Sequence, residues 1–302
     1  MGGSLTYAII TPVRNEEKTL PATIQCVASQ EMRPVRWVIV DDGSSDGTPA
    51  VIAGAEAKYN WILGVRLADR GFRKPGAGVI EAFAAGYSQL AWVPADIVVK
   101  LDADITFGSD YFARLLKEFE NDPHLGIASG RLDTETIKRF TFQNHTQGPS
   151  KAYRRTCLDE IGGLRKMKGW DLADDISANM RGWHTREFND VLMHHDRIEG
   201  RAVGVVREEF EIGKSAFRMG YLVRFVFLRA AKMTLYPPYG IRGVGYCAGF
   251  LWGLVTLRNE RLEPEFRRFL RCQQRDRLRN LTHFLIYRAS HRKDRPRTLS
   301  EI

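Results

Sequence analysis

The sequence predicts an α/β fold in which helices flank a mainly parallel sheet, followed by a helical C-terminal region. Two observations carry this prediction. Strand-like apolar runs alternate with helix-like segments over residues 6–132, which is typical of βαβ crossovers between parallel strands. The strand-like runs are continuously apolar instead of alternating, and this indicates that helices cover both faces of the sheet.

The expected elements follow one another in order along the chain. A first strand at residues 6–13 precedes a helix at 19–30, which carries Pro21 in its first turn, where proline is favoured. Further strands are expected at 35–42, 62–67, 96–102 and 125–132, and further helices at 47–59, 77–90 and 110–122. We expect residues 1–210 to form this α/β domain and residues 211–302 to form a separate basic helical region.

Polar residues collect where three of the expected strands end. The first strand runs into TPVRNEE, the second into DDGSSDGT, and the strand at 96–102 into DAD. In open α/β sheets, ligands bind beyond the carboxyl ends of the strands. Neither GxGxxG nor GxxxxGK[ST] occurs in the chain, and this removes the phosphate cradles of the dinucleotide-binding and P-loop classes.

Asp102 and Asp104 are the most informative of these polar residues. They are two positions apart, so on an extended backbone both side chains point to one side and can share a cation. Hard oxygen ligands suit Mg²⁺ or Mn²⁺, with phosphate oxygens of a substrate completing the shell. The alternative is that the two acids only form a turn or cap the next helix.

Charge and cysteine content limit the partners and the compartment. Lys and Arg outnumber Asp and Glu by 45 to 36, a net charge of +9, which suggests an anionic partner such as phosphate, nucleic acid or lipid headgroups. The four cysteines have no CxxC spacing, so neither a zinc site nor a disulfide framework is indicated. A reducing cytosol is expected, and the N-terminal MGGSLT is not expected to begin a signal peptide.

Four segments together resemble a known family. ITPVRNEEKTL, VIVDDGSSDGT, VVKLDADI and GWDLADDISANMRGW occur in this order over roughly the first two-thirds of the chain, and the set is similar to the family 2 glycosyltransferases of the GT-A fold. The resemblance implies transfer of a sugar from a nucleoside diphosphate donor with inversion at the anomeric carbon. Uridine is the base expected most, while guanosine and thymidine donors stay open.

The resemblance also implies which residues bind the donor. Thr11 and Asp42 would contact the nucleobase or its ribose, and Asp102 and Asp104 would hold the metal-diphosphate and the donor ribose. The full expected donor-binding set is Thr11, Pro12, Arg14, Glu16, Asp42, Arg73, Lys74, Asp102, Ala103 and Asp104. Arg70, Arg73 and Lys74 would contact the diphosphate or lie in a solvated loop. His195 is a candidate third ligand of Mn²⁺ or Mg²⁺ beside Asp102 and Asp104, or meets the donor phosphates together with Arg197.

The resemblance places the catalytic base on a later helix. Asp174, Asp175 and Arg181 match the family's acid pair and following arginine. Asp175 would deprotonate the acceptor hydroxyl, and Asp174 would support it. The alternative is that these acids complement the dipole of the helix N-terminus. Trp170 would pack against a sugar ring or, as is more common, belong to the core.

The C-terminal region mixes aromatic and aliphatic residues with arginines. Its apolar run at residues 243–257 is shorter than the roughly 20 residues that a membrane-spanning helix needs. We expect this region to bind an anionic membrane surface, which places the protein at the cytoplasmic face of the cell membrane or in the cytoplasm. The alternative is a helical subdomain that packs on the sheet. The expected acceptor is lipid-linked or a saccharide.

Two other function classes are open at this point. The first is a non-catalytic basic protein that binds membrane or nucleic acid, but such a module has no need for acids at converging strand ends. The second is a sugar-phosphate nucleotidyltransferase, whose glycine-rich N-terminal signature is missing after AIITPV. The transferase interpretation is therefore favoured, and nucleic acid is not an expected partner.

Overall fold

The computed structural model describes residues 4–71, 76–133, 145–195 and 202–291. Three cations of the sequence analysis, Arg73, Lys74 and Arg197, lie outside these residues. The chain divides into two compact units, residues 1–199 and 200–302. The composition change at residue 211 falls inside helix α7 (Ala202–Arg218) of the second unit.

The first unit contains an eight-stranded sheet with the strand order β3-β2-β1-β4-β7-β6-β8-β5. The strands are β1 (Tyr7–Val13), β2 (Arg36–Asp41), β3 (Ile62–Arg66), β4 (Ile97–Leu101), β5 (Ile105–Phe107), β6 (Leu125–Leu132), β7 (Ser150–Arg154) and β8 (His184–His195). The helices are α1 (Leu20–Ala28), α2 (Thr48–Lys58), α3 (Ala77–Ser88), α4 (Tyr111–Asn121), α5 (Arg155–Glu160) and α6 (Trp170–Asn179). The predicted α/β class and every predicted strand and helix between residues 6 and 132 are confirmed.

The sheet is parallel in its first half and mixed in its second. Strands β3, β2, β1 and β4 are parallel neighbours, as predicted. Strand β7 then runs antiparallel to both β4 and β6, and β5 runs antiparallel to β8. The sequence analysis assigned no strand to residues 150–154, so it placed β6 directly in the parallel series.

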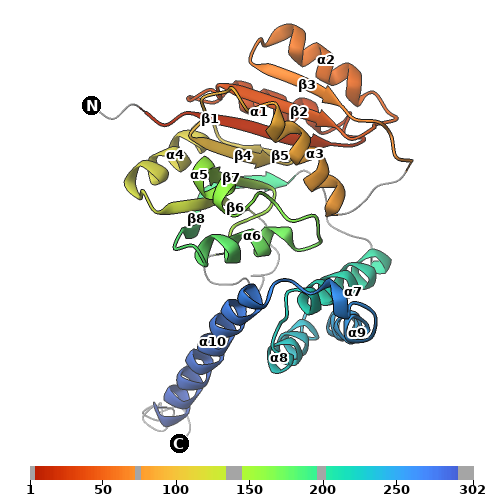
Figure 1. Cartoon of the computed structure of the whole chain (residues 1–302), viewed down its shortest axis with the longest axis vertical. Helices are drawn as coiled ribbons and strands as arrows, with labels where there is room; N and C mark the ends of the chain where they lie inside the picture. Colours follow the sequence, from red (N-terminus) through yellow and green to blue (C-terminus); the bar gives the residue numbers. More distant parts are fainter. Residues whose placement is uncertain (1–3, 72–75, 134–144, 196–201, 292–302) are drawn as a thin grey trace, which may run out of the picture. The chain divides into compact units, whose positions relative to one another are not determined.

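Helices cover both faces of the sheet, as the continuously apolar strands predicted (Figure 1). Alternate residues of β1 and β2 face opposite sides. Ile9 and Trp37 pack in one cluster with α1, α2 and α4, whereas Ile10 and Val38 pack in a second cluster with α3 and α5. Because the strand interiors are buried on both sides, the polar residues of β1, β2 and β4 gather at their carboxyl ends.

Pairing between β4 and β7 brings two buried lysines together. Lys100 lies directly opposite Lys151 in the antiparallel register, and directly opposite residues place their side chains on the same face of a sheet. Lys100 precedes the two aspartates of the D-x-D motif, and Lys151 lies under the N-terminal part of α6. The topology therefore joins these two regions, which are about 70 residues apart in the sequence.

The second unit is helical. It consists of α7, α8 (Val223–Met233), α9 (Ile241–Thr256), a short 3₁₀ helix (Arg258–Glu260) and α10 (Pro264–His291). Helices α7 and α9 approach closely because Gly213 and Gly249 lie at their contact, where a Cβ atom would meet the backbone of Tyr246 and Phe210. Within the described part of the chain, no helix combines the length and the apolar character needed to cross a membrane.

Candidate active site

Asp42 lies at the end of β2 among arginines. Its carboxylate Oδ1 accepts a hydrogen bond from Arg70, whose other terminal nitrogen donates to Glu81 Oε2 at 2.6 Å. Arg14 donates to the backbone carbonyl of Asp42 and to Asp69 Oδ1, the latter at 2.7 Å. The structure thus brings Asp42 and Arg14, two of the predicted donor-binding residues, into contact. It also places Arg70, expected at the diphosphate or in a solvated loop, against the Asp42 carboxylate.

The other expected donor-binding residues of β1 and its loop are more enclosed. Thr11 is fully buried, and its hydroxyl oxygen accepts the indole N–H of Trp37 at 2.9 Å. Pro12 is half-buried on β1. The buried Glu16 accepts a hydrogen bond from Thr19 Oγ1 at 2.6 Å, and its backbone N–H donates to Thr48 Oγ1. The side chains of Thr11 and Glu16 are therefore engaged in contacts within the protein, between β1 and β2 and between the loops that follow them.

Asn15 joins the loops after β1 and β2, and the sequence analysis missed it. Its φ of +57° lies in the left-handed region, which asparagine tolerates better than most non-glycine residues. Its Oδ1 accepts the backbone N–H of Ser45 at 2.9 Å, and its own N–H donates to Ser44 Oγ at 3.0 Å. An asparagine two residues after a strand end is the signal that indicates such a turn.

The D-x-D residues follow β4 and have different surroundings. Asp102 is partly exposed and accepts a hydrogen bond from the buried Lys100 at 2.5 Å. Asp104 is more enclosed, and its Oδ2 lies 3.4 Å from Nε2 of His195. His195 reaches it because β5 and β8 pair with Ile105 opposite His195. Ala103 between the two acids is buried, and its carbonyl accepts the hydroxyl of Thr23.

The donor set at this point suits a divalent cation. Two carboxylates and one imidazole are ligands that Mn²⁺ accepts, and the carboxylates also suit Mg²⁺. Among the described residues, no three His, Cys, Asp or Glu side chains are close enough to hold a metal ion by themselves. Asp104 and His195 lie together, whereas Asp102 pairs with Lys100, so the described residues do not gather the three predicted ligands into one metal site.

Asp174 and Asp175 of α6 both contact Lys151, whose side chain is fully buried. Lys151 Nζ lies 2.6 Å from Asp174 Oδ1 and 3.1 Å from Asp175 Oδ1, and it also donates to the carbonyl of Asp171. Tyr153 donates its hydroxyl hydrogen to Asp174 Oδ2 at 2.5 Å. Lys151 thus opposes the charge of Asp174, and the hydrogen bond from Tyr153 fixes its second oxygen.

Asp175 has two further partners that the sequence analysis missed. Thr146 donates its backbone N–H to Oδ2 at 2.9 Å and its hydroxyl to Oδ1 at 2.7 Å. Nδ1 of His145 lies 2.8 Å from Oδ2. His145 and Asp175 are 30 residues apart, so no local pattern could have revealed the contact.

The two acids differ in basicity. Burial raises the pKa of Asp174 to about 7, against the opposing charge of Lys151. Burial also acts to raise the pKa of Asp175, but the charge of Lys151 and the hydrogen bond from His145 outweigh it and hold this pKa below the usual range. Burial lowers the pKa of Lys151 less than its three acidic neighbours raise it. Lys151 therefore stays charged.

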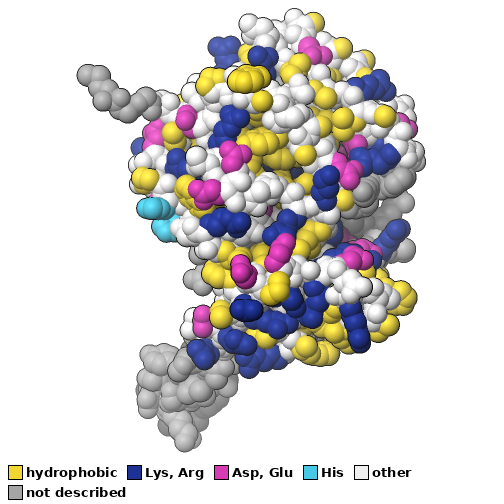
Figure 2. All heavy atoms as spheres, viewed as in Figure 1, with side chains coloured by type: hydrophobic (Ala, Val, Ile, Leu, Met, Phe, Trp, Pro, Cys, Tyr) yellow, Lys and Arg dark blue, Asp and Glu magenta, His cyan; other side chains and the backbone are white. Residues whose placement is uncertain are grey.

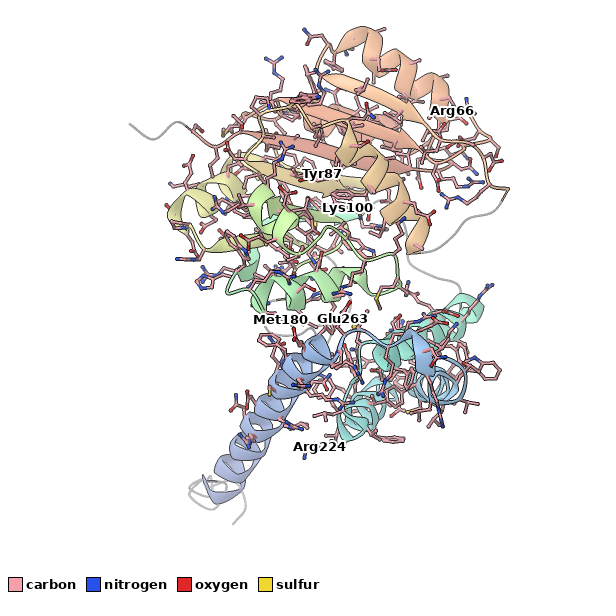
Figure 3. All side chains as sticks on the ribbon, in the orientation of Figure 1. Arg66, Tyr87, Lys100, Met180, Arg224 and Glu263 are labelled. Atoms are coloured by element: carbon pink, nitrogen blue, oxygen red, sulfur yellow. The ribbon has the colours of Figure 1, made fainter. Side chains whose placement is uncertain are left out.

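Trp170 connects the D-x-D end of the site to the acid pair. Nζ of Lys100 lies 5.2 Å and Nζ of Lys151 lies 5.7 Å from its ring. The ring is buried, as the core-packing alternative expected. Lys100, labelled in Figure 3, bonds to the carbonyl of Gly148 as well as to Asp102. Arg181 lies just beyond the end of α6, is exposed, and donates to the carbonyl of Ser177 on that helix.

Sequence comparison places the chain among known transferases. The profile of Glycosyl transferase family 2 matches residues 8–173. The undecaprenyl-phosphate 4-deoxy-4-formamido-L-arabinose transferase of Sodalis glossinidius is 36% identical over 262 residues, which cover 83% of this chain and 76% of that protein. The transferase of the same name from Serratia proteamaculans is 32% identical over 117 residues, which cover 37% of this chain and 33% of that protein.

Solved structures show the same fold at low sequence identity. A mannosyltransferase from Pyrobaculum calidifontis, solved with GDP-Man and Mn²⁺, has a TM-score of 0.59 at 17% identity, covering 82% of this chain and 86% of that one. TarS from S. aureus, solved with UDP-GlcNAc, has a TM-score of 0.54 at 15% identity, covering 88% of this chain and 78% of that one. With the GT-A fold and the family profile in agreement, the chain belongs to glycosyl transferase family 2.

Proposed function

We propose that this chain transfers a sugar from a nucleoside diphosphate sugar to a hydroxyl of a lipid-linked or saccharide acceptor. The resemblance to the family favours a uridine diphosphate sugar as the donor. The transfer inverts the anomeric configuration. The observation that supports the proposal is the register of β4 and β7, in which Lys100 lies opposite Lys151. Lys100 bonds to Asp102 of the D-x-D motif, and Lys151 bonds to Asp174 of α6. An inverting transferase needs these two functions, diphosphate binding and proton removal, on either side of one reacting carbon.

Residues at the carboxyl ends of the strands would bind the donor. Asp42, with Arg14 beside it, would meet the ribose and base, and Asp102, Asp104 and His195 would hold Mn²⁺ or Mg²⁺. A bound metal would supply positive charge to the leaving diphosphate. The described carboxylates would otherwise repel that diphosphate, and this is the physical reason to expect a cation here.

The acids of α6 would provide the base. The cluster around Asp175 would supply the negative charge that favours proton removal from the acceptor, and Asp174 with Lys151 would hold Asp175 in place. The nature of the acceptor decides whether a base is needed. A phosphate acceptor, as the names of the two relatives indicate for those proteins, is ionised at neutral pH and loses no proton, whereas a hydroxyl must lose one. The acids Asp174 and Asp175 with their partners would serve such a proton transfer, and this favours a hydroxyl acceptor.

The second unit would bind an anionic membrane surface. Figure 2 shows hydrophobic and basic side chains gathered over it. The exposed apolar side chains of α8, α9 and the segment between them are Val223, Phe227, Leu228, Leu235, Tyr239, Ile241, Val244, Leu251, Trp252, Leu254 and Val255. Arg224, Lys232 and Arg242 come from the same segments. Apolar residues bordered by cations suit the boundary between acyl chains and anionic headgroups, here at the cytoplasmic face where a lipid-linked acceptor would be met.

A donor screen tests this function. The purified chain is incubated with Mn²⁺ and a panel of UDP-, GDP- and TDP-sugars, and thermal unfolding and donor hydrolysis are measured. A true donor at 100 times its Kd stabilises the folded state by about 2.7 kcal/mol through mass action. We expect stabilisation by one nucleotide class that disappears with a chelator. Equal unfolding temperatures with every nucleotide, with and without metal, would contradict the proposal.

A further inference from the structure

Resting on the proposed function, we propose that the proton of the acceptor hydroxyl passes to Nε2 of His145, and that Asp175 positions this imidazole instead of meeting the acceptor itself. The sequence analysis assigned proton removal to Asp175 directly. Three features of the described residues carry the different assignment: the saturation of the Asp175 carboxylate, the orientation of the His145 ring, and the charges around that ring.

The Asp175 carboxylate has no acceptor position left for a substrate. An ionised carboxylate offers about four lone-pair sites. Oδ1 faces the hydroxyl of Thr146 and Nζ of Lys151, while Oδ2 faces the backbone N–H of Thr146 and Nδ1 of His145. Only 3% of the side chain is exposed. A sugar hydroxyl could bind here only by displacing one of these donors.

His145 has a nitrogen that can accept a proton, Nε2, whereas the oxygens of Asp175 are occupied by donors. An ionised carboxylate only accepts hydrogen bonds, so Nδ1 of His145 carries a hydrogen toward Oδ2. In the neutral ring the lone pair then lies on Nε2, which is the arrangement that lets a carboxylate fix the tautomer of a general base. The exposed fraction of the His145 side chain is 16%, several times that of Asp175.

The charges around His145 stabilise the ring once it has taken a proton. Asp175 faces Nδ1, and Asp171 Oδ2 lies 3.9 Å from Nε2. Burial and the charge of Lys151 act against protonation, but the two acids outweigh them and raise the pKa of His145 above its ordinary value. The ring is therefore a stronger base than Asp175, whose pKa is lowered.

The step balances as a single displacement. The acceptor oxygen forms its bond to the anomeric carbon while its hydrogen passes to Nε2 of His145. The bond from that carbon to the diphosphate oxygen breaks, and the nucleoside diphosphate leaves with the electron pair. His145 becomes an imidazolium ion between Asp175 and Asp171, and it returns the proton to solvent after the product leaves.

The decisive variant is His145→Asn, because the asparagine amide can replace Nδ1 as the donor to Asp175 but has no counterpart of Nε2. We expect turnover with a hydroxyl acceptor to fall roughly 10²–10⁴-fold, the usual contribution of a general base, with donor affinity within about threefold of the wild type. His184 is the matched control, since its Nδ1 lies 2.8 Å from Asp122 Oδ2 in an exposed pair. His184→Asn should leave turnover unchanged.

The pH profile and the imidazole spectrum separate this role from a structural one. The kcat/KM of the wild type should rise with pH through the pKa of His145, above 6.5, and this acid limb should be absent in His145→Asn. Because Asp174 also titrates near this range, the His145 signal is followed directly by ¹H–¹⁵N NMR, assigned as the one of seven histidines lost in the variant. Its pKa should fall in Asp175→Asn, because a facing negative charge is removed.

Each outcome has one meaning. A wild-type chain that transfers no sugar would overturn the proposed function, and with it the role of His145 and Asp175. Suppose that the wild type transfers sugar and that His145→Asn keeps both the wild-type rate and the rise of kcat/KM with pH. That result would overturn the role of His145 and Asp175 alone. A loss of donor affinity as large as the loss of turnover would also overturn it, because His145 would then shape the binding site instead of taking the proton.

Discussion

Replacing Lys151 with methionine tests the electrostatics of the acid cluster most severely. The lysine is fully buried with Asp174 at 2.6 Å and Asp175 at 3.1 Å, and methionine keeps most of its length without its charge. Breaking a buried ion pair on one side costs about 3–5 kcal/mol, because the remaining charges lose their partner inside the protein. We expect a loss of this size in the free energy of unfolding at pH 8.

The loss should shrink as the pH falls. Without Lys151, the pKa of Asp175 in the folded state rises above its unfolded value of about 3.8, so the folded variant holds a proton that the unfolded chain has released. A carboxyl group with a raised folded pKa costs stability as pH rises through the window between the two values, at about 1.4 kcal/mol per pH unit. The difference in unfolding free energy between wild type and variant should therefore be smaller at pH 5 than at pH 8.

Urea unfolding followed by tryptophan fluorescence measures this difference. Five of the six tryptophans lie in the first unit, so the signal reports mainly on the domain that carries Lys151. Lys117→Met, at an exposed position on α4, is the control and should change stability by less than about 0.5 kcal/mol. A Lys151→Met loss below about 1 kcal/mol at pH 8, or one that does not vary with pH, would refute the reasoning.

Three further predictions concern the other parts of the molecule. Asp104→Ala should abolish Mn²⁺-dependent nucleotide binding by calorimetry while the chain still unfolds cooperatively without nucleotide. Asp110→Ala, between β5 and α4, should bind nucleotide normally, and equal affinities in the two variants would exclude Asp104 as a ligand. Asn15→Ala should lower stability by about 1–2 kcal/mol, because alanine disfavours a left-handed backbone, and Asn15→Gly should lose less; the reverse order in urea unfolding would be contrary to this. Val244→Ser combined with Val255→Ser should reduce sedimentation with anionic vesicles, and salt should weaken wild-type sedimentation; equal binding to neutral vesicles would argue against a charged lipid surface.

Strand and helix positions in the first half of the chain could be predicted because local pattern and tertiary structure agree there. Continuous apolar runs form β1, β2 and β4, and the acids that follow β2 and β4 come at the same edge of the sheet because these strands are parallel. The position of His195 did not follow from this logic, because only the family resemblance suggested it as a metal ligand beside Asp102 and Asp104, with the donor phosphates as the alternative. The structure puts the side chains of His195 and Asp104 3.4 Å apart.

Strand β7 could not be predicted in the same way, because its buried lysine hides its strand character. Lys151 is charged yet fully buried, and only its pairing with Asp174 and Asp175 explains this. Those partners lie more than 20 residues away in the sequence, as does the partner of His145. Polar contacts across elements follow from topology, so residues that act through such contacts were the ones that sequence reasoning missed.

The anomeric configuration of the product tests the central claim most directly. The chain is incubated with Mn²⁺, the donor identified by stabilisation and a hydroxyl acceptor, and the ¹H coupling at the transferred anomeric carbon is measured by NMR before mutarotation. A single in-line displacement predicts a product whose configuration is opposite to that of the donor. A product with the donor's configuration, or a bound donor that is never consumed in the presence of acceptor, would contradict the proposal of an inverting transferase.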